Sequence, residues 1–456
     1  MAYQDPQSTE SDQKGKDSTS YAFSHSRLTK DNLYMILALW MEDFPEDKPE
    51  EKKPEKNTGE TPERNNPYKK VGAVLVLPND RSYAVDCSRN GVHAVARLLM
   101  MHHDVLEDCK VFVSRKPCSF CTKLLVQSKV KRVFYLPIEP EYRLLKDFEQ
   151  ETSRVDNLFK VSSISQSVFV PKVGEDVIKY IQNKHQTPVK KTIFFEMVDS
   201  LKKRYWMDDW MKEAKDKLPW QALDEEMRSQ VELDFTEMVT WMASILVGKE
   251  KEFNFDFELT DSERKDESFA FDPRDGIGKE QSYRLITLAK FLAERTDEPK
   301  TGVGAVIINK KKEIVGLGWN GFPSKALYGE FPRASDKDKD VPDKKYPYSI
   351  HAEQNALLMR NTKKIKGGIL FLTKTPCDDC TPLLEMMGID TVILGAEFIK
   401  KETKKGISYN NFSDAVERRK FACFSPVVSK SETSGAKRNL DREFEDQGRK
   451  RERKDC

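Results

Sequence analysis

The sequence predicts an α/β protein with two domains of the same three-layer α/β/α fold, each a mixed central sheet flanked by helices, joined by a helical Trp-rich segment. Three observations predict it. The order strand, helix, strand, helix, strand occurs twice, each copy carries one Pro-Cys-x-x-Cys segment after its second strand, and 456 residues are too many for one ordinary core.

In the first copy, apolar residues at helical spacing predict a helix from about residue 28 that Pro45 ends. Strands follow at 71–77, 110–114 and 132–136, with a helix from His93 and another after Pro117. The second copy repeats this order with a helix at 282–296, strands at 303–309, 369–373 and 391–395, and helices from His351 and after Pro376. We expect Pro376 to occupy the first helical position, since its fixed φ suits that position.

The spacing between the copies is not uniform. His93 and His351 are 258 positions apart, and Cys118 and Cys377 are 259 apart, but Val71 and Val303 are only 232 apart. The second copy therefore contains about 26 additional residues before its His, and a long loop beside a candidate site is more often functional than not.

Composition shifts divide the chain into five predicted segments. These are a disordered tail at 1–25, a first domain at 26–140 with a disordered charged loop at 45–68, a helical linker at 141–275, a second domain at 276–425 and a basic disordered tail at 426–456. The linker carries four tryptophans, which we interpret as packing against the domains, because Asp and Glu are too frequent there for a base-stacking groove: Trp206, Trp210, Trp220 and Trp241.

The charge balance and the spacing of the cysteines limit the classes of function that the sequence allows. Lys and Arg number 77 against 75 Asp and Glu, so the formal net charge of +2 provides no global positive field and makes a polynucleotide partner unlikely. The sequence contains neither an apolar N-terminal signal nor a run of 18 apolar residues, so we expect no membrane partner and a cytoplasmic and nuclear location. In such a reducing compartment, Cys-x-x-Cys pairs indicate metal binding or redox chemistry.

The second copy combines YSIHAEQNALL with TPCDDCTPLL. One imidazole and two thiolates, from His351, Cys377 and Cys380, can hold zinc and leave a fourth position open. Glu353 follows the His by two residues at the helix start, where it can lean toward that open position without binding the metal.

These residues resemble the His-x-Glu and Pro-Cys-x-x-Cys signature of the cytidine and deoxycytidylate deaminase superfamily. The resemblance implies one catalytic zinc and Glu353 as the proton shuttle. The implied reaction is hydrolytic deamination of a free deoxycytidine nucleotide, dCMP or dCTP, to the deoxyuridine nucleotide and ammonia. It also implies a homo-oligomer.

Within the superfamily, GWNGFP and KKYPYSIHAE look closest to deoxycytidylate deaminases, which implies that Asn320 contacts the substrate. The alternative is that Asn320 and Gly321 only form a turn. The number of phosphates is left open, because the basic residues of the long loop, which could bind phosphate, are mixed with acidic ones: Lys325, Arg333, Lys344 and Lys345.

The first copy keeps His93, Cys118 and Cys121 but has Val95 where the second has Glu353. A Val side chain cannot transfer a proton, so we expect a pseudo-catalytic domain with a second, structural zinc. The alternative is that the three residues are a relic without metal. Catalytically degenerate subunits occur elsewhere in the superfamily that this chain resembles, as in the paired tRNA adenosine deaminases, where one member also has Val in place of Glu.

Two basic clusters near the end of the chain form a bipartite nuclear import pattern, with an import receptor as the implied partner: Lys437, Arg438, Arg449, Lys450, Arg451, Arg453 and Lys454. The alternative is a solvated charged helix, since acidic residues intervene. The Leu-rich segment at 28–41 could pass for an export signal, but a buried first helix is the preferred interpretation.

Two other functions stay open. A deaminase acting on cytosine in RNA or single-stranded DNA would need a basic, aromatic-lined channel and would lose activity steeply with salt. A non-enzymatic zinc scaffold that binds nucleotide would not need Glu353.

Overall fold

A computed structural model describes residues 27–45, 67–184, 191–206, 223–247, 253–259, 273, 276–296, 301–322, 334, 345, 348–399 and 407–428. The predicted disordered tail at 1–25 and nearly all of the 45–68 loop lie outside these residues. The predicted tail at 426–456 also lies outside them, apart from 426–428, which form the end of strand β11 (Ala422–Val428).

The first domain contains a five-stranded mixed sheet in the order β2-β1-β3-β4-β5. The first three of these strands are antiparallel neighbours, and β3, β4 and β5 run parallel. The strands are β1 (Gly72–Val76), β2 (Ser82–Cys87), β3 (Lys110–Val113), β4 (Arg132–Tyr135) and β5 (Ser165–Val168).

The second domain repeats this topology in the order β8-β7-β9-β10-β11, with one further antiparallel strand, β6, beside β11. The internal repeat predicted from the sequence is therefore confirmed at the level of strand order and direction. The strands are β6 (Phe253–Leu259), β7 (Gly304–Ile308), β8 (Ile314–Trp319), β9 (Ile369–Leu372), β10 (Thr391–Leu394) and β11 (Ala422–Val428).

Each sheet is buried on both faces, as the alternation along its strands shows. In β1, Val74 and Val76 join the core on the side of helix α1 (Lys30–Met41), whereas Ala73 and Leu75 join the core on the opposite side. That opposite side is covered by α2 (Ala94–Met101), α3 (Ser119–Gln127) and α4 (Phe148–Lys160). The second sheet lies between α9 (Lys279–Ala293) and a layer formed by α10 (Ala352–Leu358), α11 (Thr381–Met386) and α12 (Asn410–Glu417). The predicted α/β class and three-layer arrangement are confirmed.

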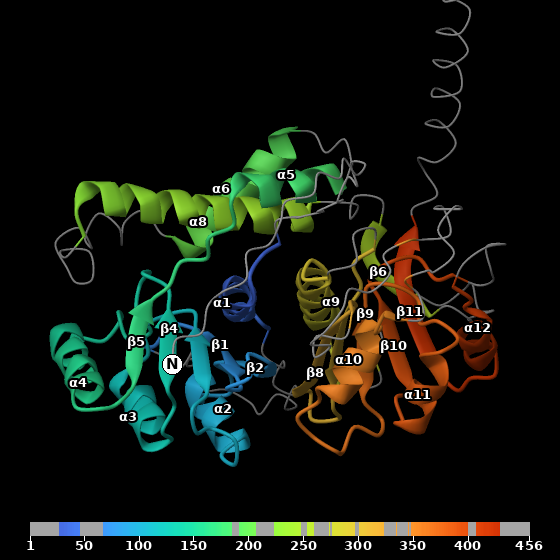
Figure 1. Cartoon of the computed structure of the whole chain (residues 1–456), viewed down its shortest axis with the longest axis horizontal. Helices are drawn as coiled ribbons and strands as arrows, with labels where there is room; N and C mark the ends of the chain where they lie inside the picture. The colour runs from blue at the N-terminus through green and yellow to red at the C-terminus, as the bar shows by residue number, and fades with distance from the viewer. Residues whose placement is uncertain are drawn as a thin grey trace, which may run out of the picture.

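The two domains lie side by side (Figure 1), joined through α1 and α9 and through edge strands β2 and β8. The Trp40 ring meets the Phe291 ring edge-on at 5.5 Å, and Trp40 Nε1 donates a hydrogen bond of 3.1 Å to the Arg284 carbonyl. One continuous apolar cluster includes both helices. The halves therefore share a core.

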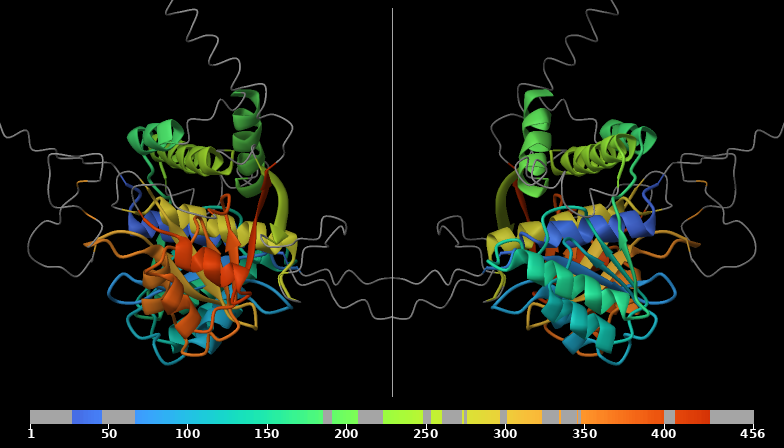
Figure 2. Two further views of the ribbon diagram at one scale, coloured as in Figure 1. Left: turned by 90° about the vertical axis from the view of Figure 1, so that its right-hand side faces the viewer. Right: turned by 90° about the vertical axis from the view of Figure 1, so that its left-hand side faces the viewer.

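A helical segment lies above the first domain and its boundary with the second in Figure 1, and at the top of both views in Figure 2. It consists of α5 (Glu175–Lys184), α6 (Lys191–Tyr205) and α8 (Glu225–Leu246), and α8 contacts α9. Trp241 is fully buried with its ring 5.5 Å from Phe291, and Trp206 packs on Phe235 at 4.3 Å. The packing interpretation is confirmed for these two tryptophans, whereas Trp210 and Trp220 lie outside the described residues.

The sheets extend past the predicted domain borders. Strands β5 and β6 and helix α4 all fall in the range assigned to the linker, yet they complete the two α/β units. The sequence of β5, SQSV, has no apolar alternation because it is an edge strand with half-exposed side chains. Helix α1 is buried from Asn32 to Met41, which confirms the buried-helix interpretation over an export signal.

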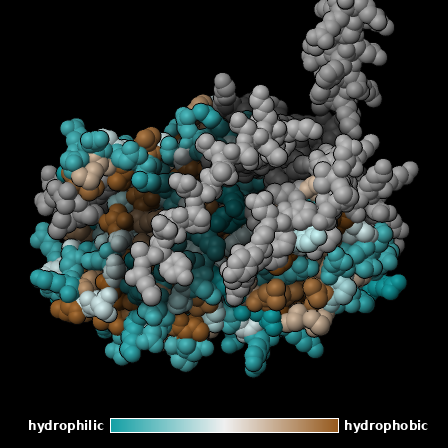
Figure 3. All heavy atoms as spheres, viewed as in Figure 1, coloured by the Kyte–Doolittle hydropathy of each residue, from teal (hydrophilic) through white to brown (hydrophobic). Residues whose placement is uncertain are grey.

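Hydrophilic residues cover much of the described surface on the face shown in Figure 3, with apolar patches among them. Among the described residues, no helix combines the length and the apolar character needed to cross a bilayer.

Candidate metal centres and active site

The second-domain site lies where two helices begin. His351 is the N-cap of α10, Glu353 lies in the first turn of that helix, and Cys380 is the N-cap of α11. Cys377 precedes α11 in a turn that the Cys377 carbonyl closes by accepting from the amides of Cys380 and Thr381. Helix α11 begins at Thr381, so the expectation that Pro376 is its first residue is wrong. The turn at Cys377 lies between Pro376 and the helix.

His351, Cys377 and Cys380 form a donor set suited to zinc. His351 Nδ1 lies 3.1 Å from Cys377 Sγ and 3.3 Å from Cys380 Sγ. A tetrahedral zinc with ordinary bond lengths places a nitrogen and a sulfur ligand about 3.5 Å apart. The arrangement therefore fits one zinc ion with three protein ligands and a fourth position left open.

Glu353 is buried beside these donors, with only 4% of its surface exposed. Burial is the main reason that the pKa of its carboxyl is raised to about 7, and the negative charge of Cys377 acts in the same direction. A hydrogen bond with Cys380 places the carboxyl next to a sulfur ligand. A carboxyl that titrates near neutral pH can both accept and return a proton.

The position of α10 depends on two glycines of strand β8. A Cβ on Gly318 would lie 2.2 Å from the Ala352 carbonyl oxygen, and one on Gly316 would lie 2.7 Å from that of Ala356. The helix therefore packs directly on the strand backbone. Asn355 adds a hydrogen bond of 2.6 Å from its Nδ2 to the Trp319 carbonyl.

The Asn320 side chain is largely occupied by its own domain. Its Oδ1 accepts from the Val303 amide at 2.7 Å, and its Nδ2 donates to the Thr301 carbonyl at 2.8 Å. These two bonds connect the segment that leads into β7 with the residue that follows β8. Its role in substrate binding stays a prediction, and so do the phosphate roles of the loop lysines: Lys345 is buried, while Lys325, Arg333 and Lys344 lie outside the described residues.

Tyr409 also borders the site and was not singled out from the sequence. It is the N-cap of α12, and its pKa is raised mainly by burial and further by the charges of Cys377 and Glu353. The Ser408 carbonyl beside it accepts from the amide of Asp378, between the two cysteines. No local motif marks Tyr409, because only the fold brings α12 to the metal turn.

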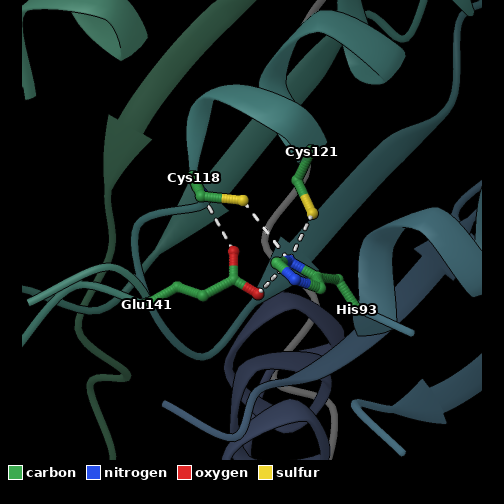
Figure 4. A group of neighbouring side chains, drawn as sticks. All are labelled: His93, Cys118, Cys121 and Glu141. Atoms are coloured by element: carbon green, nitrogen blue, oxygen red, sulfur yellow. Dashed lines mark hydrogen bonds and ion pairs between the residues drawn. The ribbon is translucent and has the colours of Figure 1, made fainter. Parts of the chain in front are cut away.

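The first-domain site has the same framework. His93 is the N-cap of α2, Cys118 is the N-cap of α3, and Cys121 lies in the first turn of α3. His93 Nδ1 lies 3.3 Å from Cys118 Sγ and 3.4 Å from Cys121 Sγ. Figure 4 shows a fourth side chain, Glu141, directed at the same point. The four residues can hold a metal ion together.

Val95 occupies the position in α2 that Glu353 occupies in α10, two residues after the His N-cap of each helix. It is 2% exposed and belongs to the apolar cluster behind the helix. The helical position that Glu353 occupies in the second domain is therefore retained in the first domain without a carboxyl.

A family model described as the cytidine and deoxycytidylate deaminase zinc-binding region matches residues 56–137 and 279–396. A deoxycytidylate deaminase of Mycobacterium phage D29 is 32% identical over 122 residues, which cover 92% of that protein and 25% of this chain. The chain belongs to the cytidine and deoxycytidylate deaminase family.

Other family members match different shares of the chain. "Cytidine and dCMP deaminase domain-containing protein 1" of Danio rerio is 26% identical over 87% of this chain and 89% of its own length. The deoxycytidylate deaminase of Homo sapiens is 35% identical, over 24% of this chain and 61% of its own length. A crystal structure of a cyanophage S-TIM5 dCMP deaminase with dCMP and dUMP covers 33% of this chain and 99% of that one, at 22% identity and a TM-score of 0.26.

Within this family, the two matched regions contain His351, Glu353, Cys377 and Cys380 in one copy and His93, Cys118 and Cys121 in the other. Glu141 lies outside both regions. The import pattern at 437–454 lies outside the described residues.

Proposed function

We propose that the second domain is a zinc-dependent deaminase that converts a free deoxycytidine nucleotide, dCMP or dCTP, to the deoxyuridine nucleotide and ammonia. The observation that carries the proposal is the buried Glu353 carboxyl beside a donor set of one imidazole and two thiols. Family membership supports the deaminase chemistry, and the named deoxycytidylate deaminases support the nucleotide substrate.

His351, Cys377 and Cys380 would hold the zinc. When bound, zinc supplies the Lewis acidity that makes a water molecule nucleophilic near neutral pH. Glu353 accepts a proton from that water as its oxygen adds to C4 of the cytosine ring, and it delivers the proton to ring N3. A second transfer through Glu353 protonates the amino group, which leaves as ammonia, so water and cytosine become uracil and ammonia.

The first domain does not take part in this chemistry in our proposal. Val95 can neither accept nor return a proton, and the domain contains no counterpart of the Asn-Gly-x-Pro segment at Asn320. Its role is architectural, since α1 of this domain packs on α9 of the other.

The proposal extends to assembly and location. Family resemblance supports a homo-oligomer, and the basic clusters at 437–454 support import into the nucleus in addition to a cytoplasmic pool. Light scattering of the full chain measures the oligomeric state. Imaging of a Lys450→Ala, Arg451→Ala variant in cells measures nuclear import.

Ammonia release from the purified full chain tests the function with cytidine, dCMP, dCTP and a cytosine-containing oligonucleotide as separate substrates. We expect turnover of a free deoxynucleotide. Turnover of the oligonucleotide alone, falling steeply with salt, would instead indicate a polynucleotide deaminase. No turnover of any substrate by zinc-loaded protein would leave a non-catalytic scaffold.

Replacing the proton shuttle gives the sharper result. Glu353→Gln keeps the size of the side chain but removes its basicity, so we expect turnover to fall by about 10²- to 10⁴-fold or more with the zinc content unchanged. Glu385→Gln, on the partly exposed α11 surface, is the matched control and should retain activity. A Glu353→Gln variant with normal turnover would show that another group moves the proton.

A further inference from the structure

The first-domain site differs from the second by one additional donor. Glu141 Oε1 lies 2.9 Å from His93 Nδ1, and the donor atoms of His93, Cys118, Cys121 and Glu141 all lie within 4.8 Å of one another. Figure 4 shows all four side chains converging from two helix starts and one loop. Among the described residues, the second site gathers three such donors.

The separations match a tetrahedral zinc. The His93 nitrogen lies 3.3 and 3.4 Å from the two sulfurs, against about 3.5 Å for ordinary bond lengths. His93 Nδ1 lies 2.9 Å from Glu141 Oε1, against about 3.3 Å for a nitrogen and an oxygen bound to the same zinc. A small movement of these two side chains away from each other accommodates the ion.

The backbone of Glu141 is fixed on both sides. Its amide donates to the Lys116 carbonyl at 3.1 Å, two residues before Cys118, and its carbonyl accepts from the Lys69 amide at 2.8 Å. Its second carboxylate oxygen, Oε2, accepts from the Cys118 amide at 2.9 Å. Oε2 is thus held by the backbone, while Oε1 faces the imidazole. Hydrogen bonds of this kind, from groups outside the metal site, orient metal ligands.

The carboxylate and the two thiols are buried together. Glu141 is 2% exposed, and Cys118 and Cys121 are fully buried. A carboxylate and two thiols buried together cannot all ionise unless a positive charge compensates them. A divalent ion held by all four side chains would neutralise the carboxylate and both sulfurs at this one point.

The sequence of the second domain has a lysine at the position that corresponds to Glu141 by residue spacing. Strands β4 and β10 are 259 positions apart, as are the first cysteines of the two sites, and the residue 259 positions after Glu141 is Lys400. A lysine ammonium does not bind zinc. The carboxylate thus belongs to the copy that lacks the proton shuttle.

We propose that His93, Cys118, Cys121 and Glu141 bind zinc as a closed structural site, with Glu141 in the position that water takes in a catalytic site. Four protein ligands are typical of structural zinc, and three with an open position are typical of catalytic zinc. The first domain is then closed to water and to pyrimidine substrate at the metal, independently of Val95.

Metal binding by the full chain tests the site without any assay of turnover. In a Cys377→Ser, Cys380→Ser background the second site is removed, and we expect about one zinc per chain to remain by elemental analysis. Adding Glu141→Ala should weaken zinc affinity, measured by competition with a chromophoric chelator, by about 10- to 100-fold. Glu139→Gln, in the same loop and paired with Lys69, is the matched control and should leave the affinity unchanged.

Cobalt substitution separates a closed site from an open one. The visible spectrum of Co²⁺ in the first site should not respond to added azide, whereas in the Glu141→Ala variant azide should bind and shift the spectrum. Loss of all zinc from the two-serine background, an azide response with Glu141 present, or unchanged zinc affinity in Glu141→Ala would each overturn the proposal.

A second measurement covers the case in which the serine variants do not fold. In the otherwise unaltered chain, chelator should remove zinc in two phases, and Glu141→Ala should abolish the slow phase while Glu353→Gln preserves it. A slow phase that persists in Glu141→Ala would also overturn the assignment of Glu141 as a ligand.

Discussion

Val95 and Glu353 occupy the same helical position in the two sites but differ in their chemistry. Each lies two residues after a His N-cap, and each is buried. The pKa of the Glu353 carboxyl, raised to about 7 mainly by burial, suits proton transfer at neutral pH, whereas Val95 offers an apolar contact to the core. The difference is chemical, because the backbone is alike.

Restoring the missing carboxyl should not restore catalysis to the first domain. In a Glu353→Gln chain we expect Val95→Glu to leave ammonia release at the level of Glu353→Gln alone, because Glu141 would still close the metal position. Val95→Gln in the same chain controls for the cost of a buried polar group. Ammonia release clearly above the Glu353→Gln level would contradict both the closed site and the inactive role of this domain.

The local part of each site could be predicted from short sequence motifs, whereas finding Glu141 requires the strand order of the fold. His351, Glu353, Cys377 and Cys380 lie within two short motifs at fixed spacing. Glu141 follows Cys121 by 20 residues without any motif. Strands β3 and β4 are parallel neighbours, so the segments after them meet at one edge of the sheet; attention to polar residues after adjacent parallel strands would have found it.

At the scale of elements, the contact of α10 with β8 positions the candidate active site. Gly316 and Gly318 let the helix approach the strand backbone, and the helix start carries His351 and Glu353. The equivalent strand of the first domain, β2, has no glycine. The glycines that allow this close approach are therefore present in β8 and absent from β2.

A larger side chain between α10 and β8 should reduce catalysis, although it does not touch the metal ligands. Gly318→Val places a branched side chain where even a Cβ lies 2.2 Å from the Ala352 carbonyl oxygen, so α10 must move. We expect a stability loss of about 1–3 kcal/mol in urea unfolding and a fall in turnover of about 10²-fold from misplacement of Glu353. Gly276→Ala, which meets only the flexible Lys312 side chain, is the control. Unchanged turnover and stability would show that α10 is not positioned by this contact.

The elements that sequence reasoning identified are those with strong apolar runs, such as 71–77 and 303–309. It missed β2, which contains the polar residues Ser82 and Asp86, and β8, which contains two glycines, and it placed β5 and β6 in the linker. The segment FNFDFEL of β6 alternates aromatic and polar residues, a strand signal that could have been recognised. For β5, pairing with β4 outweighs weak local preference.

At the scale of the whole molecule, the two domains depend on each other because one apolar cluster contains α1, α8 and α9. Trp40 is central to it, with the Phe291 ring on one side and the Arg284 guanidinium 4.2 Å from its ring centre. Separated domains would expose these faces to water. The first copy therefore covers an apolar surface of the second.

Trp40→Ala should therefore loosen both halves of the chain, although Trp40 belongs to the first. We expect a stability loss of about 3–5 kcal/mol and reduced hydrogen-exchange protection in α9 as well as in α1, because the cavity opens between these two helices. Phe195→Ala, which removes an aromatic ring that is 58% exposed, should leave protection in both helices unchanged. A loss of protection confined to α1 would mean that α9 is held by its own domain alone, and that the shared cluster does not couple the two copies.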